Sequence, residues 1–452
     1  MSSDTRRVLR RSGRPPAGLT GVADPARRVA RAVALLVVFV ISACLAGCGG
    51  GATNATATPA SGRVINVPGD QATVQAALDR ARPGDVVLLA AGIYRDAVTI
   101  SRPGVTLRGV DRNTVVFDGG YRKETAITVA ADGGTVENLT VHGYNANGVF
   151  VSGAAGKTVD PAKTFGVGDD VLKGWRVSYV TSYDNGLYGI YAFAARYGRI
   201  DHSYASGHPD SGLYVGQCKP CDTVVTDSTA TGNAIGYYGT NASGGVYVIR
   251  SVFRGNRVGL TPNSQKMEKL APQSETVVAG NLVIDNDNPQ SPAVPKGAFG
   301  LGIAIGGGTR NTVIRNRVEG NGGAGIILTD LDDYPPENNR VEGNLLADNG
   351  ADLAWSVPAG ARAAGNCFTG NTFATSLPAD IEKVLPCDGS APAAGTPESF
   401  RSPAAPPDAN YKTLPAPPAQ PSMPDANAPA SVPTQVPPQV DLATIIVPAR
   451  QA

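Results

Sequence analysis

Charge is scarce in this chain. Asp, Glu, Lys and Arg make up 17% of the 452 residues, and the formal net charge is +1. Residues 1–47 hold eight of the 39 basic residues and two of the 38 acidic ones, so residues 48–452 carry a net charge of −5. Such a surface lacks the basic patch that nucleic acid or an anionic lipid surface requires. We therefore expect no nucleic-acid partner.

Cysteine is equally sparse, with six in the whole chain. Two of them, Cys44 and Cys48, lie near the N-terminus, which leaves four that can pair as disulfides in an oxidising compartment. The Cys367/Cys387 pair brackets a helix predicted over 377–385 and would pin a terminal cap. The Cys218/Cys221 pair resembles a redox or metal dithiol, but it follows a strand, which favours a small disulfide in a turn.

Long apolar runs are missing as well. The apolar run Ala32–Ile41 is shorter than the ~20 residues that a membrane span needs. It follows an arginine-rich start and precedes Leu45-Ala46-Gly47-Cys48, an order typical of an export signal. The four residues resemble the lipobox of bacterial lipoproteins, which implies a signal peptide over 1–47 and lipidation at Cys48. The alternative is a plain secretory signal. With the lipobox, residues 48–62 are a tether and the protein is exported and anchored to the outer face of the cell membrane through its lipid only.

Glycine, by contrast, is abundant and periodic. Most gaps between the glycines that open short apolar strands are 23 or 24 residues, and the two long gaps are 41 and 43 residues. Such a period indicates a stacked solenoid in which the long gaps carry insertions. The glycines are Gly148, Gly189, Gly212, Gly236, Gly259, Gly302 and Gly325.

The residues after each glycine predict which side chains face the core. Positions one and three are mostly apolar and should point inward. Position two should point outward, and there it is aromatic on successive coils. Aromatic rings stack on sugar rings and phenol groups supply hydrogen bonds, so this row is a candidate substrate-binding surface. The alternative is an aromatic stack that only stabilises the sheet. The row consists of Phe150, Tyr191, Tyr214 and Tyr238.

A second repeat places asparagine or serine five residues before asparagine. Examples are Asn281/Asn286, Asn316/Asn321 and Ser228/Asn233. Asparagine tolerates the left-handed corner conformation and bonds to the next coil, so we expect structural ladders at two corners.

The start of the repeat region has a helical pattern between Asp70 and Pro83-Gly84, followed by Asp85–Leu89, Gly92-Ile93-Tyr94 and Val105–Gly109. This run resembles the opening of the right-handed parallel β-helix proteins of the pectin-lyase-like superfamily. The resemblance covers about 63–387 and implies an all-β solenoid of roughly a dozen coils with an N-terminal capping helix. A disulfide-pinned cap would close its C-terminal end.

Three insertions, 153–174, 262–275 and 329–338, leave at one corner and can wall the aromatic face. The last is acidic, and its oxygen ligands could hold Ca²⁺, but a solvated loop explains them better because no known calcium-loop spacing is matched. These candidate calcium ligands are Asp330, Asp332, Asp333 and Glu337.

Catalytic candidates beside the row are His208, Asp210 and Lys219. His208 and Asp210 could act as a base and its partner; as turn residues at His208-Pro209-Asp210 they would only shape a corner. The superfamily's lyases carry Arg-x-Pro-x-x-Arg, which is missing here, and its epimerases carry Asp-Pro-His, which is reversed. No catalytic set transfers residue by residue.

The coil pattern is also similar to periplasmic β-helix proteins that help to load copper during nitrous-oxide reductase maturation. With three histidines (His142, His202 and His208), three methionines and paired cysteines, no soft copper site is visible.

The last 65 residues hold 15 of the 35 prolines, so residues 388–452 should form an extended tail or spacer, free or docked along the body. The function that fits best is an envelope lipoprotein that binds, and can process, an extended carbohydrate. Two alternatives stay open: a non-catalytic surface scaffold or partner-binding protein, and a polysaccharide lyase, hydrolase or epimerase.

Overall fold

The computed structural model describes residues 62–155, 171–293, 297–358, 364–390, 399–431 and 433–450, all within one compact unit, Thr58–Ala452. The expected signal peptide over 1–47, the lipidation site Cys48 and the tether as far as residue 61 lie outside the described residues. Within the described part of the chain, no helix is long and apolar enough to cross a membrane.

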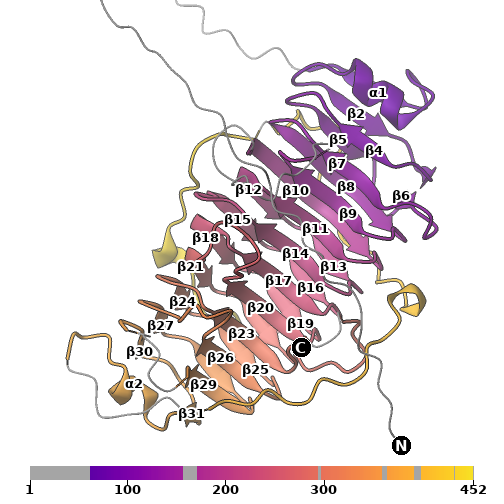
Figure 1. Ribbon diagram of the computed structural model, residues 1–452. Helices are drawn as coiled ribbons and strands as arrows, with labels where there is room; N and C mark the ends of the chain where they lie inside the picture. The colour runs from indigo at the N-terminus through magenta and orange to yellow at the C-terminus, as the bar shows by residue number, and fades with distance from the viewer. Residues whose placement is uncertain are drawn as a thin grey trace, which may run out of the picture. The chain divides into compact units, whose positions relative to one another are not determined.

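Parallel strands stack coil upon coil through the unit, as Figure 1 shows. One sheet of 11 strands, here sheet B, collects one strand from each coil, and a second sheet of 20 strands, sheet A, forms the remaining faces. Neighbouring coils pair in parallel in both sheets. The chain is therefore an all-β, right-handed parallel β-helix, the stacked solenoid that the repeat predicts and the architecture that the resemblance implies.

Sheet B comprises β4 (Val98–Ile100), β7 (Thr125–Val129), β9 (Asn147–Ser152), β11 (Tyr188–Phe193), β14 (Ser211–Gly216), β17 (Ile235–Thr240), β20 (Val258–Asn263), β23 (Leu301–Gly306), β26 (Ala324–Thr329), β29 (Ala351–Ser356) and β31 (Ser376–Leu377). Sheet A comprises β1 (Val64–Val67), β2 (Val86–Leu89), β3 (Gly92–Tyr94), β5 (Thr106–Gly109), β6 (Val115–Asp118), β8 (Gly134–His142), β10 (Leu172–Tyr183), β12 (Ala195–Asp201), β13 (Tyr204–Ser206), β15 (Thr223–Thr226), β16 (Thr229–Thr231), β18 (Ser243–Ile249), β19 (Val252–Arg254), β21 (Ser274–Ala279), β22 (Leu282–Ile284), β24 (Thr312–Ile314), β25 (Arg317–Glu319), β27 (Arg340–Glu342), β28 (Leu345–Ala347) and β30 (Cys367–Thr369).

The repeated glycines start the strands of sheet B because a side chain would not fit there. A Cβ atom on Gly302 would lie 2.5 Å from the carbonyl oxygen of Gly325 on the next coil and 3.0 Å from the Nδ2 atom of Asn321. Gly259 meets the same obstacles in Gly302 and Asn286. The two residues that follow at positions one and three are buried, as predicted; Ile326 and Leu328 are examples.

Asparagine ladders join the coils at the corners. The Oδ1 atom of Asn316 accepts hydrogen bonds from the backbone N–H of Asn281 (2.9 Å) and from its Nδ2 atom (2.9 Å). Asn316 in turn donates from its own backbone N–H (2.9 Å) and Nδ2 atom (2.9 Å) to Asn344. A parallel ladder runs through Asn256, Asn286, Asn321 and Asn349. The spacing of five therefore marks two stacked corners, as expected.

Both ends of the core are covered. At the N-terminal end, α1 (Val74–Arg80) buries Val74, Ala77 and Leu78, and its first turn is capped by the Thr73 hydroxyl group, which accepts a bond from the backbone of Ala76. This helix packs against β1, β2 and β4. The predicted capping helix is confirmed.

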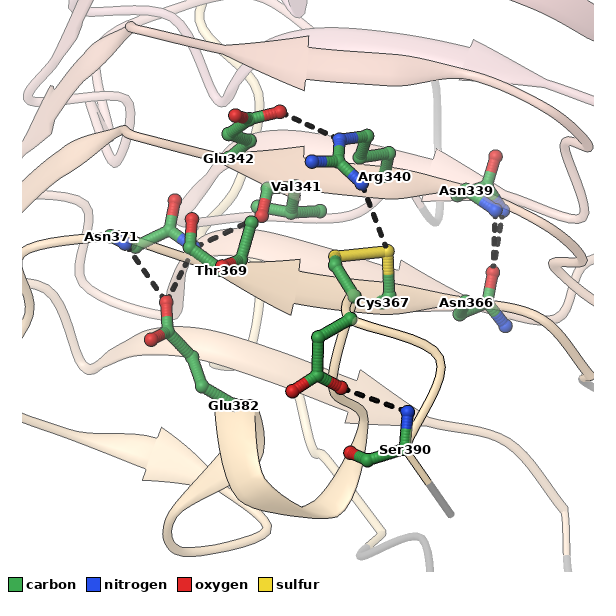
Figure 2. The surroundings of a disulfide bond; sticks show 12 residues. Asn339, Arg340, Val341, Glu342, Asn366, Cys367, Thr369, Asn371, Glu382 and Ser390 are labelled. Carbon is green, nitrogen blue, oxygen red and sulfur yellow. Dashed lines mark hydrogen bonds and ion pairs between the residues drawn. A yellow bond between two sulfur atoms is a disulfide. The ribbon is translucent and has the colours of Figure 1, made fainter. Parts of the chain in front are cut away.

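At the C-terminal end a short helix, α2 (Ile381–Val384), closes the last coil. Figure 2 shows its Glu382 carboxylate accepting bonds from the backbone (2.8 Å) and side chain (2.9 Å) of Asn371, the last asparagine of a ladder. The predicted Cys367–Cys387 disulfide is present beside it. The helix is shorter than the predicted stretch over 377–385, because Leu377 still pairs as the end of β31.

The proline-rich C-terminus is docked along the body. We call residues 399–431 and 433–450 the strap; it contains two short 3₁₀ turns, η2 (Tyr411–Thr413) and η3 (Leu442–Thr444). It leaves the last coils beside Ser356, reaches Asn113 among the early coils and returns as far as Glu319. Proline has no N–H, so the strap offers mainly carbonyl acceptors.

Arginine side chains of the body supply the donors for those carbonyl groups. Arg315 donates to Leu442 (2.7 Å) and Ile445 (3.0 Å), and Arg317 donates to Pro448 (2.7 Å). Arg112, which is buried, donates to Pro421 (3.0 Å). A guanidinium group carries five donors in a fixed fork, so it can bind several carbonyl groups of an extended chain at once.

The strap also covers two aliphatic patches on the outside of the coils. Phe400 packs on the outer face of sheet B, against Leu301, Ala324 and Ile327. Ile445 packs on the outer face of sheet A, against Ile249 and Ile314. The strap is therefore part of the packed structure over much of its length.

The asparagine ladder generates a first prediction. Replacing Asn316 with Ala should lower the free energy of unfolding by about 2–4 kcal/mol, because it leaves buried groups of Asn281 and Asn344 unpaired. Urea denaturation followed by circular dichroism measures the change. Gln290→Ala, an exposed side chain without a hydrogen bond in the described residues, is the control and should change it by less than about 0.5 kcal/mol. Equal effects of the two changes would contradict a structural role for the ladder.

The strap generates a second prediction. Phe400→Ala should loosen the strap and speed tryptic cleavage after Arg401 and Lys412, because the ring anchors the first part of the strap on sheet B. Val436→Ala is the matched control, since Val436 lies in the same strap and is 60% exposed. Cleavage at an unchanged rate in Phe400→Ala would show that the apolar contact does not hold the strap.

Candidate functional site

Two columns of side chains line the outer face of sheet B. The predicted column, two residues after each glycine, brings Tyr191, Tyr214 and Tyr238 into register on consecutive coils. A second column stands just before each glycine, and in it Tyr188 pairs in register with Ser211. Both columns face outward, since the ring of Tyr188 stacks on that of Tyr191 at 4.3 Å. The alternation of inward and outward side chains along a strand does not hold for Tyr188, because the strand begins there, at a corner of the coil.

The aromatic row is continuous but less exposed than predicted. Phe150 stacks on Tyr191 at 5.0 Å, and Tyr214 meets Tyr191 edge-on at 4.8 Å and Tyr238 at 5.6 Å. Tyr214 is 2% exposed, so the prediction of an exposed ring is wrong at this position. Its neighbours in the row pack against it on both sides, and Glu268 from the insertion over 262–275 lines the same cavity.

A cavity of about 500 Å³ opens over the later part of this row. Tyr188, Tyr214 and Tyr238 form its aromatic wall, and the polar side chains of Asp210 and Glu268 reach it. Glu268 and Gln265 of the insertion over 262–275 line one part of it, and Ala293, Gly297 and Ala298 line another. The remaining lining residues are Ala234, Ile235, Thr240, Arg257, Val258, Thr261, Asn263, Leu301, Ala304 and Leu331.

Glu268 brings a carboxyl group to the cavity. Burial raises its pKa from the ordinary value of 4.5 to about 7, and hydrogen bonds from Tyr214 and Asn241 oppose part of that rise. The Nδ2 atom of Asn241 lies 3.5 Å from its Oε2 atom. A carboxyl group with a pKa near neutrality can both donate and accept a proton at physiological pH.

Asp210 brings the second carboxyl group. Burial raises its pKa from 3.8 to about 6, and the nearby hydroxyl groups of Tyr188 and Ser211 offset part of the rise. Its Oδ1 atom is buried and has no hydrogen-bond partner in the described part of the chain. Such an acceptor is suited to a donor from a ligand. Asp210 is thus the one predicted catalytic candidate that lines the cavity.

His208 does not reach the cavity. It is 0% exposed, and its backbone N–H (3.0 Å) and Nδ1 atom (2.8 Å) both bond to the Oδ1 atom of Asn233. The Nε2 atom lies 3.3 Å from Ser182 and from Asn185. Burial lowers its pKa to about 4, so it is a neutral member of a corner ladder. The structure therefore favours the corner interpretation of His208 over the acid–base pair.

Lys219 is exposed in the turn between Cys218 and Cys221, which form the predicted disulfide. It does not line the cavity. The turn contributes its buried sulfur atoms to the core rather than a reactive dithiol to a site.

The acidic insertion over 329–338 packs beside the insertion over 262–275. Asp333 forms an ion pair with Lys266 (3.2 Å), and Asp332 accepts a bond from the Lys266 backbone (3.2 Å). Among the described residues, no group of three or more His, Cys, Asp or Glu gathers to hold a metal ion. A calcium site at Asp330, Asp332 and Asp333 stays a prediction. Most of the third insertion, over 153–174, lies outside the described residues.

Two residues on which the proposed chemistry of the cavity depends, Tyr188 and Glu268, were not identified from the sequence. Tyr188 was missed because strict alternation assigns the residue before a glycine to the core. Glu268 lies in the insertion over 262–275, and no pattern showed which side chain of that loop turns towards the tyrosines. The sequence signal that could have identified Glu268 was the position of its insertion, at the corner next to the row of aromatic residues.

The similarities of this chain to known proteins lie in its repeated coils. Residues 269–382 match a family described as periplasmic copper-binding protein (NosD), which is less than half of the chain. No curated protein matches. Among solved structures, the A-module of a mannuronan C-5 epimerase of Azotobacter vinelandii is 16% identical, with a TM-score of 0.47 over 68% of this chain and 92% of that chain.

Two further structures are similar at the same level. Tailspike protein 2 of Escherichia coli O157:H7 bacteriophage CAB120 is 11% identical, with a TM-score of 0.45 over 66% of this chain and 42% of that chain. An alginate lyase of the PL6 family is 13% identical, with a TM-score of 0.42 over 69% of this chain and 51% of that chain. At these identities the likeness concerns the fold, so the chemistry of the cavity rests on this chain's own residues.

The residues matched to the copper-binding family do not fit copper. The segment 269–382 contains no histidine and no methionine, and its one cysteine, Cys367, forms a disulfide. Copper sites require imidazole, thiolate or thioether ligands. The matched segment consists of coils β21 to β31 and α2, that is, of the repeat itself.

The buried carboxyl group of Glu268 generates a third prediction. Its pKa is raised in the folded state, so the folded protein should lose stability as pH rises from about 4.5 through about 7. Glu268→Gln should remove this loss and be the more stable protein at pH 8, by on the order of 1 kcal/mol, with no gain at pH 4. Melting temperatures across this pH range measure the difference, and Glu342→Gln on sheet A is the control. A parallel pH profile of wild type and Glu268→Gln would contradict the raised pKa.

Proposed function

We propose that this protein binds a segment of a glycan chain in the cavity over Tyr188, Tyr214 and Tyr238. The observation that carries the proposal is the combination of an aromatic wall and convergent polar groups in one cavity of about 500 Å³. Binding sites for small ligands typically have volumes of this order, apolar walls and a few polar groups.

The aromatic wall matches the C–H face of a sugar ring, and the polar groups match its hydroxyl groups. The C–H face of a pyranose can pack on the rings of Tyr188 and Tyr238, which are half-buried and not fully covered. Its hydroxyl groups can bond to Asp210, Glu268 and Gln265, all of which line the cavity. The regular stacking of coils would repeat such contacts along an extended ligand.

We propose further that the protein can process the bound glycan. Asp210 and Glu268 are two carboxyl groups whose pKa values of about 6 and about 7 suit proton transfer near neutral pH. They are our candidates for acid and base in a lyase, hydrolase or epimerase reaction. In a non-catalytic binder the same groups would only hold hydroxyl groups.

We further propose that the protein acts outside the cytoplasm, on a lipid anchor at Cys48. The start of the sequence supports this placement, and the two disulfides support an oxidising compartment. An envelope location would bring the cavity to extracellular or cell-wall glycans.

Binding by the cavity generates a fourth prediction. Tyr238→Ala should weaken the binding of an oligosaccharide identified on a glycan panel by at least about tenfold, since a stacking wall is lost. Tyr204→Ala removes an outward tyrosine on β13, outside the cavity, and should leave the affinity unchanged. Isothermal titration calorimetry measures both, and absorbance at ~235 nm detects lyase products, which carry a new double bond. Equal affinity of Tyr238→Ala and wild type would exclude the cavity as the binding site and favour the scaffold alternative.

A further inference from the structure

The insertion over 262–275 supplies two polar side chains to the cavity, those of Gln265 and Glu268. The Nε2 atom of Gln265 donates a hydrogen bond to the hydroxyl group of Tyr238, so this side chain is also joined to the aromatic wall. An insertion has no counterpart on the neighbouring coils to stack on, so its position depends on a few contacts with the body. The arrangement of polar groups in the cavity therefore depends on those contacts.

Asn241, the residue directly after β17, makes a two-point contact with the insertion. Its Oδ1 atom accepts a hydrogen bond from the backbone N–H of Gln265 (3.0 Å), and its Nδ2 atom donates to the backbone oxygen of the same residue (2.9 Å). Its backbone N–H donates to the oxygen of Asn263 (2.9 Å). Asn241 is buried, and a buried amide group that bonds through both of its polar atoms holds its partner in one place. The insertion is thus fixed at Gln265.

The same amide group faces Glu268. Its Nδ2 atom lies 3.5 Å from the Oε2 atom of Glu268, so one nitrogen atom lies near both the Gln265 backbone oxygen and the Glu268 carboxyl group. A donor at this place favours the charged form of the carboxyl group and opposes the effect of burial on its pKa. The position of the insertion and the protonation of its acid are therefore linked through one side chain.

Two further contacts hold the rest of the insertion. Gln217, which follows β14 one coil earlier, accepts a hydrogen bond from the backbone N–H of Leu270 (3.2 Å). The hydroxyl group of Ser264 accepts one from the backbone N–H of Gln273 (2.9 Å) and closes the base of the insertion. Of these anchors, Asn241 is the one that bonds directly to a residue of the cavity lining.

We infer that Asn241 is a positioning residue of the glycan site, which holds the insertion so that Gln265 and Glu268 line the cavity. The inference rests on the proposed function and deepens it, because Asn241 is not among the described lining residues and acts through the two that are. It also separates Asn241 from the corner asparagines of the ladders. Asn316 bonds to the asparagines of neighbouring coils, whereas the amide group of Asn241 bonds to the insertion.

The pH dependence of stability tests the contact with Glu268 without a ligand. Asn241→Asp keeps the shape of the side chain and an acceptor for Gln265, but it places a carboxylate beside Glu268. The difference in melting temperature between Asn241→Asp and the Asn241→Asp/Glu268→Gln double variant isolates the contribution of Glu268. Its pH midpoint should lie at least about 0.5 pH unit above the midpoint for wild type and Glu268→Gln, since a nearby like charge disfavours ionisation. An unchanged midpoint would overturn the inference.

The remaining ionisable residues of the described cavity lining are the same in all four proteins of this comparison. They are Tyr188, Asp210, Tyr214, Tyr238 and Arg257. Their titration therefore cancels in the comparison to the extent that they do not respond to residue 241.

Binding tests the positioning role on the full chain. Asn241→Gly suits the left-handed backbone at this corner (φ 47°) and removes the amide group. It should weaken the binding of the oligosaccharide identified on the glycan panel by at least about tenfold, as measured by calorimetry. Asn316→Ala, which removes a ladder amide group outside the cavity, is the control and should change the affinity by less than about twofold.

The outcomes separate the inference from the proposed function. Unchanged affinity in a folded Asn241→Gly protein would overturn the inference and leave glycan binding in the cavity in place. If Asn241→Gly does not fold, as judged by its melting curve, the pH midpoint of Asn241→Asp decides. A wild type that binds no oligosaccharide of the panel would overturn the proposed function itself.

Discussion

The hydrogen-bonded contact between one corner asparagine and the next is the interaction on which the rest of this structure depends. Each amide oxygen accepts from the backbone and the side chain of the coil before, as Asn321 does from Asn286 (3.0 Å and 3.1 Å). The glycine beside it, Gly302, leaves room for the amide group of Asn321. Because these contacts fix the register of neighbouring coils, a side chain at a given position stacks on its counterpart, and a row of tyrosines becomes one wall.

The sequence predicts this framework well because the framework is local and repeated. The glycine period identifies the strands of sheet B, the spacing of five identifies the corners, and the capping helix and both cysteine pairs are present. The candidate site was predicted less completely. Its aromatic wall follows in part from the repeat. Glu268, however, lies on an insertion without periodicity. Tyr188 lies at a corner, where inward and outward side chains no longer alternate. His208 was a natural catalytic candidate by residue type, yet it replaces an asparagine in a ladder.

The side chains on the outer face of sheet B differ from one group of coils to the next, and the strap docks on one of these groups. Where the face is aromatic it lines the cavity, and where it is aliphatic, at Leu301, Ala324 and Ile327, Phe400 covers it. Composition predicts an extended, proline-rich chain but not where it docks. The docking depends on arginine donors and apolar patches that only the folded coils bring together, such as Arg315 with Ile249 and Ile314 beneath Ile445. The strap is thus held by features that exist only in the folded solenoid.

A crystal structure of the full chain with a bound oligosaccharide identified on a glycan panel would test the central claim most directly. The account predicts a sugar ring against Tyr188 and Tyr238, with a hydroxyl group within hydrogen-bond distance of Asp210 Oδ1. An oligosaccharide bound on sheet A, or elsewhere with the tyrosine cavity empty, would contradict it.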